Sequence, residues 1–435
     1  MWLGNARARG GLQKPPAPGT QAAMRVLFIH QNFPGQFRHL AAAMAAAGHA
    51  VSALGEAQHP PLPGVTLHRY AAPPVPADTQ ARAHPYLRRL ETHVRRGQHA
   101  ARAAAELRNR GYVPDVIHAH IGWGEALYMR DIFPDARILL HCEYFFRSQG
   151  GDVGFDPIYG GMTLDTAART RMLNTDQLIQ LEAADWGLTP TEFQKSRYPH
   201  WVRDRMSVIH EGVDTAAITP DGPAEFRLPD GRVFRRGDPV VTYAARHLEP
   251  YRGFPSYMAA LARLQKLRPD AHAVIVGGSK GSYGGRPPGG GTWREHVMDQ
   301  LGDGLDMSRI HFFDWLSHTG LHTLFRVSAA HTYLTYPFVL SWSVLEAMAC
   351  GAAILGSSTA PLREVIEDGV NGRLVDFFDT EAIAHGLAEM LADQKALEPM
   401  RAAARAGVVQ RYDLNTICLP QQIALLERLA ATGRG

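Results

Sequence analysis

Short hydrophobic runs alternate with longer helical stretches through the first half of the chain, beginning at residue 24. The predicted strands are residues 24–30, 50–54, 115–120, 136–141, 186–189 and 206–210. The predicted helices between them include residues 36–47, 87–111 and 172–184. Strands that alternate with helices in this way are typical of a parallel sheet covered by helices on both faces.

A stretch rich in proline, glycine and charged residues then interrupts the pattern, and it predicts a linker at 219–236. After the linker the alternation restarts. The second set of predicted strands is 240–245, 273–277, 309–313, 330–336 and 353–357. The second set of predicted helices is 254–266, 293–300, 320–327, 342–349 and 380–391, with a last amphipathic helix at 414–431.

We therefore expect an α/β protein with two Rossmann-like, doubly wound domains at 24–218 and 237–410, followed by a C-terminal helical segment at 411–435. Two domains are also the default for a chain of 435 residues. Residues 1–23 are basic, contain glycine and proline, and lack the apolar run of a secretory signal, so we expect a disordered extension. Met24 directly precedes the first strand and is a candidate for the true start. Two such domains that face each other form a cleft, which is a favoured place for a ligand.

Composition narrows the class of protein. The chain is 45% hydrophobic and 20% charged, as a soluble globular protein is, and its net charge of +3 does not favour nucleic-acid binding. Three widely spaced cysteines, Cys142, Cys350 and Cys418, disfavour a disulfide framework or a zinc site and fit a reducing cytoplasm. No run approaches 18 apolar residues, so no membrane-spanning helix is predicted. We expect a cytoplasmic protein.

The segment from Tyr336 to Val375 carries the strongest indication of chemistry. A strand ends at Tyr336, and a short loop then leads into the helix at 342–350. Free backbone N–H groups at the start of that helix, around Leu340 and Trp342, form an anion site together with the hydroxyls of two serines. These serines are Ser341 and Ser343. With Glu346 farther along the same helix, the segment suits a nucleotide diphosphate with its ribose alongside.

The same segment resembles a known family. The block LEAMACG at 345–351 is similar to the signature helix of glycosyltransferase family 4, and REVIEDGVNG at 363–372 resembles the family's following segment. The resemblance extends over about residues 24–430. It implies the GT-B architecture, a last helix that crosses back to the first domain, and retaining transfer of a sugar from a nucleotide-diphosphate sugar to a hydroxyl acceptor. The implied setting is glycan, glycolipid or glycoconjugate biosynthesis, with Glu346 bound to the ribose hydroxyls.

Two arginines follow the strand at 240–245. Arg246 and Arg252 come after the carboxyl end of this strand, which opens onto the cleft in a parallel sheet. Two cations there can bind a diphosphate and stabilise its charge as it leaves. Arg246 matches an arginine of the family's motif, whereas Arg252 stands where the family usually has lysine. The change keeps the charge but alters the donor geometry.

Phe338 departs from the family pattern. The family often has a glutamate eight positions before Glu346, where it contacts the donor sugar, and a phenyl ring cannot accept a hydroxyl proton. Three explanations are open: a different mode of sugar recognition, another group that supplies the contact, or a loss of activity. The strand that ends near Phe313 and Leu316 lines the nucleotide base in the family.

The first domain supplies further candidates. Gly35 lies in the first strand-to-helix turn, where a missing Cβ allows the backbone close to a ligand, or where it simply serves the turn. His141 ends a strand near which the family places a histidine beside the transferring sugar. His120 and Glu143 lie at neighbouring strand ends. Each of these three is also explained as an ordinary core residue.

Absent motifs narrow the mechanism. The chain has no Asp-x-Asp triplet, so we expect no metal and no cofactor beyond a UDP-, GDP- or dTDP-sugar donor. No Gly-x-Gly-x-x-Gly follows the first strand, which disfavours nicotinamide binding. The arginine-rich helix at 88–110 has two interpretations, contact with an anionic membrane that holds a lipid-linked acceptor or an ordinary solvated face. A GT-B nucleotide-sugar epimerase and an inactive nucleotide-sugar-binding relative remain the alternatives.

Overall fold

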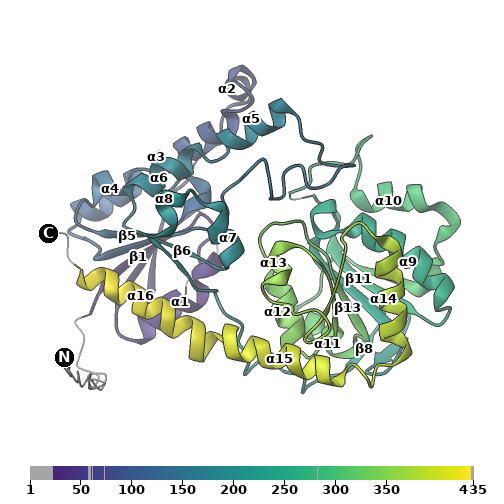
Figure 1. Ribbon diagram of the computed structural model, residues 1–435. Helices are drawn as coiled ribbons and strands as arrows, with labels where there is room; N and C mark the ends of the chain where they lie inside the picture. Colours follow the sequence, from purple (N-terminus) through teal and green to yellow (C-terminus); the bar gives the residue numbers. More distant parts are fainter. Residues whose placement is uncertain (1–22, 57–59, 61, 73, 282, 433–435) are drawn as a thin grey trace, which may run out of the picture.

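In the computed structural model, which describes residues 23–56, 60, 62–72, 74–281 and 283–432, two α/β units lie side by side (Figure 1). Each is built on a parallel sheet with helices packed against it. The predicted doubly wound fold class is therefore confirmed. The extension expected at 1–23 lies, except for residue 23, outside the described residues.

The first sheet has seven strands in the order β3-β2-β1-β4-β5-β6-β7. The strands are β1 (Arg25–Ile29), β2 (Ala50–Gly55), β3 (Val65–Arg69), β4 (Val116–His120), β5 (Arg137–His141), β6 (Trp186–Thr189) and β7 (Met206–Val208). The helices of this part are α1 (Arg38–Ala46), α2 (Ala77–Arg82), α3 (Arg88–Asn109), α4 (Met129–Ile132), α5 (Leu164–Met172), α6 (Thr175–Ala183), α7 (Glu192–Arg197) and α8 (His200–Arg203), with 3-10 turns η1 (Gly35–Phe37) and η2 (Ile121–Trp123).

The central strand β1 shows why this sheet forms. Its side chains alternate between two cores, because successive residues of a strand point to opposite faces. Leu27 and Ile29 pack in the core on one face, and Val26 and Phe28 pack in the core on the other. The edge strand β3 was not predicted, since it is only partly buried and lacks the continuous apolar run of the central strands.

The second sheet has six parallel strands in the order β12-β11-β10-β13-β14-β15. The strands are β10 (Val240–His247), β11 (His272–Gly278), β12 (Ile310–Phe313), β13 (Ala330–Tyr333), β14 (Ile354–Ser357) and β15 (Arg373–Val375). The helices are α9 (Phe254–Leu267), α10 (Trp293–Leu301), α11 (His318–Val327), α12 (Trp342–Ala349), α13 (Ala360–Arg363), α14 (Thr380–Ala392) and α15 (Glu398–Tyr412), with 3-10 turns η3 (Pro250–Arg252), η4 (Gly302–Gly304) and η5 (Met307–Arg309). Register pairs such as Val241 with Ala330 place β10 at the centre of this sheet.

The segment expected as a linker at 219–236 contains a folded hairpin instead. Strands β8 (Glu225–Arg227) and β9 (Val233–Arg235) pair in antiparallel fashion. Phe226 and Phe234 are buried, and the ring of Phe226 lies 5.5 Å from that of Phe313. Apolar residues on either side of a proline–glycine turn thus attach the segment to the second sheet, an effect that local composition does not reveal.

The end of the chain returns to the first sheet. After α15 the chain passes through a π-helical turn, η6 (Leu414–Cys418), into α16 (Leu419–Ala431), drawn in yellow in Figure 1. Leu425, Leu426 and Leu429 of α16 pack in the same core as Val26 and Phe28 of β1. The last helix therefore covers one face of the first sheet.

A loop after β5 also crosses between the two sheets. Asp152 accepts hydrogen bonds from Tyr144, at 3.0 Å, and from Tyr251 of the second unit, at 2.9 Å. Four residues later, Asp156 accepts one from Tyr336 at 2.5 Å. Both carboxylates are buried, and burial raises the pKa of Asp152. The loop is thus held to the second unit by hydroxyl–carboxylate bonds.

The basic helix α3 carries part of its charge in ion pairs. Arg95 lies 2.8 Å from Glu91, and Arg96 lies 3.3 Å from Glu56. None of the helices in the described part of the chain is both long and apolar enough to cross a bilayer. Contact of α3 with an anionic membrane stays a prediction.

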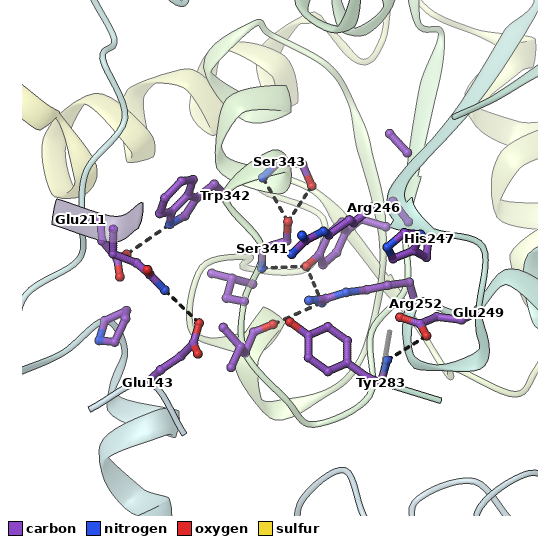
Figure 2. Close-up of a pocket in the computed structure, with 17 residues that line it drawn as sticks. Glu143, Glu211, Arg246, His247, Glu249, Arg252, Tyr283, Ser341, Trp342 and Ser343 are labelled. Atoms are coloured by element: carbon purple, nitrogen blue, oxygen red, sulfur yellow. Dashed lines mark hydrogen bonds between the residues drawn. The ribbon is translucent and has the colours of Figure 1, made fainter. Parts of the chain in front are cut away.

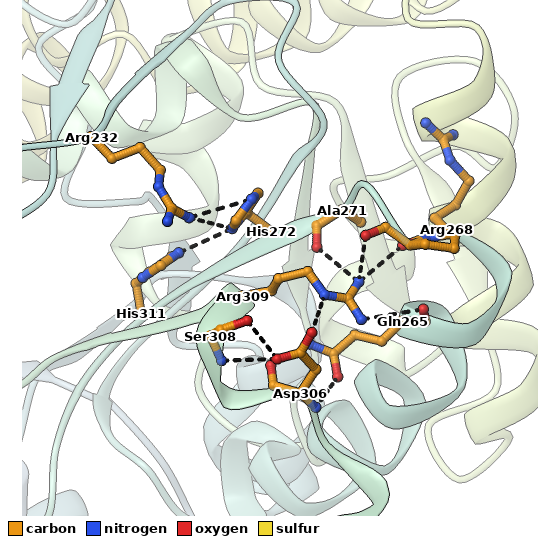
Figure 3. Close-up of polar contacts among 10 residues, drawn as sticks. Arg232, Gln265, Arg268, Ala271, His272, Asp306, Ser308, Arg309 and His311 are labelled. Carbon is orange, nitrogen blue, oxygen red and sulfur yellow. Dashed lines mark hydrogen bonds and ion pairs between the residues drawn. The ribbon is translucent and has the colours of Figure 1, made fainter. Parts of the chain in front are cut away.

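One arginine joins the start of β12 to the connection between α9 and β11 (Figure 3). Arg309 donates to the Asp306 carboxylate at 2.7 Å and to the carbonyls of Pro269, at 3.0 Å, and Ala271, at 3.5 Å. Hydrogen bonds from Ser308 and Arg309 hold the pKa of Asp306 at about 2. Arg309 thereby satisfies backbone carbonyls that lie outside any helix or strand ladder.

Replacing Arg309 by alanine should lower the free energy of unfolding by about 1–3 kcal/mol, because those carbonyls lose a charged donor. Urea denaturation followed by circular dichroism measures the change. Lys266→Ala is the matched control, since Lys266 is exposed on α9 and surface changes of this kind stay within about 0.5 kcal/mol. Equal stability of the two variants would contradict the role given to Arg309.

Candidate functional site

A cleft of about 280 Å³ lies between the two sheets and is lined from both sides (Figure 2). The first unit contributes Gln36, Glu143, Pro190 and Glu211. The second contributes residues 244–247, Glu249, Arg252, Tyr283, Tyr333 and residues 339–343. The first wall carries two carboxylates and no guanidinium group, whereas the second carries two guanidinium groups together with the Glu249 carboxylate.

Arg246 and Arg252 both line the cleft, as the sequence predicts. Arg246 is exposed near the end of β10 and makes no hydrogen bond or ion pair with the residues that the structure describes. Arg252 is half-buried and donates from Nη1 to the hydroxyls of Tyr333, at 3.0 Å, and Thr335, at 2.8 Å. Neither arginine has a carboxylate partner in the described part of the chain, so both charges remain available to an anion.

Gly253 permits the turn that places Arg252. Its φ of 69° is left-handed, and a Cβ there would lie 2.4 Å from the Cβ of Leu334. Only glycine fits such a position without strain. The turn lets α9 begin directly after the arginine, so the guanidinium stays at the edge of the second sheet.

The start of α12 is part of the second wall of the cleft. Ser341 caps the helix by accepting from the Ser343 N–H at 3.3 Å, and its own N–H donates to the Tyr333 hydroxyl at 2.9 Å. Leu340, Ser341, Trp342 and Ser343 all line the cleft, as predicted. Backbone N–H groups at a helix start attract anions. The cap, the two serine hydroxyls and the two arginines therefore face the same space.

Glu143 connects the first wall to the buried histidines behind it. Its Oε1 accepts from Gln36 at 3.2 Å, and its Oε2 lies 3.4 Å from His120 Nε2. Burial raises the pKa of Glu143, but the contact with His120 outweighs burial and leaves that pKa below its ordinary value. His120 itself is buried, with Nδ1 accepting from the Gly122 N–H at 3.0 Å. This bond assigns the proton to Nε2, facing Glu143.

Glu211 forms the second histidine–carboxylate pair. Its Oε1 lies 3.2 Å from His141 Nε2, and its Oε2 accepts from the Trp342 indole of α12 at 3.2 Å. Burial raises the pKa of Glu211, but the bond from His141 and the charge of His210 outweigh it and lower that pKa to about 2. His141 is therefore one residue removed from the cleft, behind Glu211, and Glu211 connects the two walls (Figure 2).

Gly35 lies behind the first wall. Its φ is 46°, and a Cβ would come within 2.8 Å of His30 Nε2. The neighbouring Gln36, rather than Gly35, lines the cleft. Burial and the nearby His120 lower the pKa of His30 to about 2, so this imidazole is neutral at physiological pH. The glycine thus allows the turn to approach His30.

Besides Gly35, His120 and His141, four further predicted residues are not among those that line the cleft. Phe338 is 4% exposed and packs against Tyr144, Tyr251 and Tyr283. Phe313 and Leu316 are partly buried against the second core. Glu346 lies one turn beyond Ser343 on α12, with its Oε2 3.3 Å from His322 Nε2.

Sequence reasoning missed Glu211, Gln36, Glu249 and Tyr283. Glu249 is buried and accepts backbone N–H bonds from Tyr283 and Gly284 at 3.0 and 3.1 Å, which holds that loop at the cleft. Glu211 follows β7 at the same sheet edge as His120 and His141. Those histidines are candidates because they lie at the carboxyl ends of parallel strands, and the same argument applies to Glu211. Gln36 and Tyr283 carry no such signal, because only the tertiary fold brings them to the cleft.

Comparison with known families assigns both halves of the chain. Residues 47–218 match the model described as glycosyl transferase family 4 group, and residues 229–407 match the model described as glycosyl transferases group 1. A D-inositol 3-phosphate glycosyltransferase of Mycolicibacterium vanbaalenii is 30% identical over 44% of this chain. The match spans 42% of that relative, less than half its length. A GDP-mannose-dependent alpha-(1-6)-phosphatidylinositol monomannoside mannosyltransferase of Mycolicibacterium smegmatis is 27% identical over 52% of this chain and 58% of its own.

Solved structures agree on the fold. Sucrose-phosphate synthase of Thermosynechococcus elongatus superposes with a TM-score of 0.71 at 19% identity, over 94% of this chain and 100% of its own. Anabaena HepE in complex with UDP-glucose superposes with a TM-score of 0.63 at 16% identity, over the same shares of the two chains. These neighbours confirm the GT-B architecture that the resemblance implied. Since the two family models together span most of residues 47–407, the chain belongs to the family 4 glycosyltransferases with the GT-B fold.

Proposed function

We propose that the protein transfers a sugar from a nucleotide-diphosphate sugar to a hydroxyl acceptor with retention of anomeric configuration, in glycoconjugate biosynthesis. The observation that carries the proposal is the pair of arginines without carboxylate partners beside the start of α12. Cations and backbone N–H groups directed at one space are what a pyrophosphate requires. Membership of family 4 supports the same reaction class.

The donor in this proposal is a UDP-, GDP- or dTDP-sugar. Support comes from proteins similar to this chain: the mannosyltransferase relative is named for GDP-mannose, and HepE was solved with UDP-glucose. Glu346 is proposed to bind the ribose hydroxyls, since it lies on α12 one turn beyond the phosphate-facing serine. Phe313 and Leu316 are proposed to lie on the side of the base.

The reaction proposed is a front-face displacement. The bond between the anomeric carbon and the phosphate oxygen breaks, and a bond from that carbon to the acceptor oxygen forms on the same face. Arg246 and Arg252 stabilise the charge that develops on the leaving diphosphate. The acceptor proton passes to an oxygen of that diphosphate. Two guanidinium groups supply the positive charge at this point, so the proposal includes no metal.

The acidic wall is proposed to bind sugar hydroxyls. Glu143 and Glu211 present oxygens that accept hydrogen bonds, and the histidines behind them orient these carboxylates. His30 is neutral and His118 is buried with a pKa well below its ordinary value, so these two imidazoles add no positive charge behind the wall. The wall therefore suits neutral, hydroxyl-rich groups. A lipid-linked acceptor at the inner face of a membrane is compatible with this wall, with α3 as the proposed contact.

Calorimetric titration with UDP, GDP and dTDP tests the donor assignment, with the matching monophosphates as controls for the second phosphate. We expect one diphosphate to bind more tightly than its monophosphate and to raise the melting temperature by mass action. The corresponding nucleotide sugar is then supplied with acceptor pools, and the anomeric configuration is determined by NMR. Failure of all three diphosphates to bind would contradict the proposal. A product with an altered sugar still attached to its nucleotide would indicate an epimerase.

A further inference from the structure

Three side chains with metal-binding atoms meet at the junction of α11 and α12. His318 and His322 are four residues apart on α11, so they lie on the same face of the helix, one turn apart. Glu346 reaches toward them from α12. The potential ligand atoms of all three lie within 4.8 Å of one another. In the described part of the chain this is the only group of three such residues with that spacing.

The spacing already approaches that of a zinc site. Zinc–nitrogen and zinc–oxygen bonds of about 2.0–2.1 Å at tetrahedral angles separate neighbouring ligand atoms by about 3.3–3.5 Å. His322 Nε2 and Glu346 Oε2 are 3.3 Å apart. The exposed His318 needs only a small side-chain adjustment to complete the triangle.

The surroundings leave a path to solvent. The side chains of His322 and Glu346 are 13% and 15% exposed, and His318 is exposed. An ion can therefore enter past His318, while a fourth position remains open to water. Two histidines and a glutamate with one open position are the ligand set of several zinc sites.

We propose that His318, His322 and Glu346 bind a divalent transition-metal ion of the zinc class. We further propose that the ion competes with the nucleotide for Glu346. A carboxylate that coordinates a metal no longer accepts hydrogen bonds from a ribose with the same oxygen. The metal is thus an inhibitor of donor binding and takes no part in sugar transfer. The second half of this inference rests on the proposed function, and the first half does not.

Ligand chemistry sets the expected selectivity. Imidazole nitrogens suit zinc, copper, nickel and cobalt, whereas magnesium and calcium prefer an all-oxygen environment. Zinc and nickel should bind to the full chain, and millimolar magnesium should not displace them. The simpler interpretation is that His322 only orients Glu346 by a hydrogen bond, and zinc titration decides between the two.

The first experiment is calorimetric titration of the metal-free full-length protein with Zn²⁺ alone. His318→Ala and His322→Ala should each lower the affinity of one site at least about tenfold, because loss of a group that only orients a ligand already has that effect. His385→Ala is the matched control, since His385 is exposed on α14 beside Glu381 and belongs to no such group of three among the described residues. It should bind zinc as the parent does.

Cobalt gives an independent readout. Co²⁺ in a tetrahedral site shows intense visible absorption, which should appear in the parent and in His385→Ala and be lost in His318→Ala. His318 is exposed, so its replacement should leave the melting temperature unchanged. If zinc isotherms and cobalt spectra of the His318 and His322 variants match those of the parent, the site does not exist.

The second experiment measures UDP, GDP and dTDP affinity in EDTA and in saturating zinc. Zinc should weaken binding to the parent but not to His318→Ala, and this comparison also corrects for zinc that binds the free nucleotide. Unchanged affinity in the parent, with zinc bound at the site, would overturn the competition. If no diphosphate binds even in EDTA, the proposed function fails, while the first experiment still decides the metal site.

Discussion

Replacing Arg252 by alanine is expected to lower kcat/KM by about 30- to 900-fold, which corresponds to a loss of roughly 2–4 kcal/mol of transition-state stabilisation. The guanidinium lies in the cleft beside the start of α12 and has no carboxylate partner in the described residues. Its charge is therefore available to a diphosphate, and the need for that charge grows as the phosphate leaves. Steady-state kinetics with the donor identified by calorimetry measure the effect.

Arg252 also contacts the Tyr333 and Thr335 hydroxyls and the Val339 carbonyl, so its loss could act through the loop rather than the charge. Two variants separate these causes. Arg252→Lys keeps the charge and should recover much of the activity. Arg246→Ala removes an exposed guanidinium that makes no hydrogen bond or ion pair with the described residues, so it should lower kcat/KM without lowering the melting temperature. Native turnover in both alanine variants would show that neither arginine binds the diphosphate.

Phe338→Glu, which introduces the residue that the family often has at this position, is expected to lower the free energy of unfolding by at least about 3 kcal/mol. Loss of a buried phenyl ring alone is worth roughly 3–5 kcal/mol, and an unpaired buried carboxylate adds to that. The ring is 4% exposed and lies 4.6 Å from Tyr144 of the first unit and 4.9 Å from Tyr283. Urea denaturation and the melting temperature measure the loss.

Phe338→Leu is the matched control, because it keeps an apolar side chain and should lose far less stability. A stable and more active Phe338→Glu variant would instead show that the position belongs to sugar recognition. The buried tyrosine cluster gives Phe338 a packing role, so its departure from the family pattern does not by itself indicate an inactive protein. Glu143 and Glu211 line the cleft, and the proposed function assigns them to sugar hydroxyls in its place.

The sequence predicted the elements whose signal is local. The helix expected at 342–349 has those bounds in the structure, because Ser341 caps its start and Gly351 follows its end. The central strands were found from their continuous apolar runs. Strands β3 and β15 were missed, since an edge strand or a three-residue strand has no such run. The hairpin at 225–235 lies in the segment that the sequence predicts as a linker, because its two phenylalanines are buried only by tertiary contacts.

The residues of the site also fall into those with a local signal in the sequence and those without one. Arg246, Arg252 and Ser341 could be predicted because strand ends and helix starts converge at one edge of a parallel sheet. The contact between Glu211 and Trp342 joins residues 131 positions apart, and no local pattern foretells it. The position of Phe338 in a tyrosine cluster likewise depends on Tyr144, which reaches it from the other unit.

The loop that carries Asp152 and Asp156 bears on how the cleft can open. Tyr251 and Tyr336 belong to the second unit, yet each donates to a carboxylate of this loop. Phe155, which lies between the two aspartates in the loop, packs on Tyr336 and Phe377. The chain itself crosses between the units close to Glu211, where the Val213 N–H donates to the Tyr412 carbonyl at 2.8 Å. An opening that keeps these crossings intact would have to break the buried bonds of Asp152 and Asp156, so we expect this loop to oppose opening of the cleft.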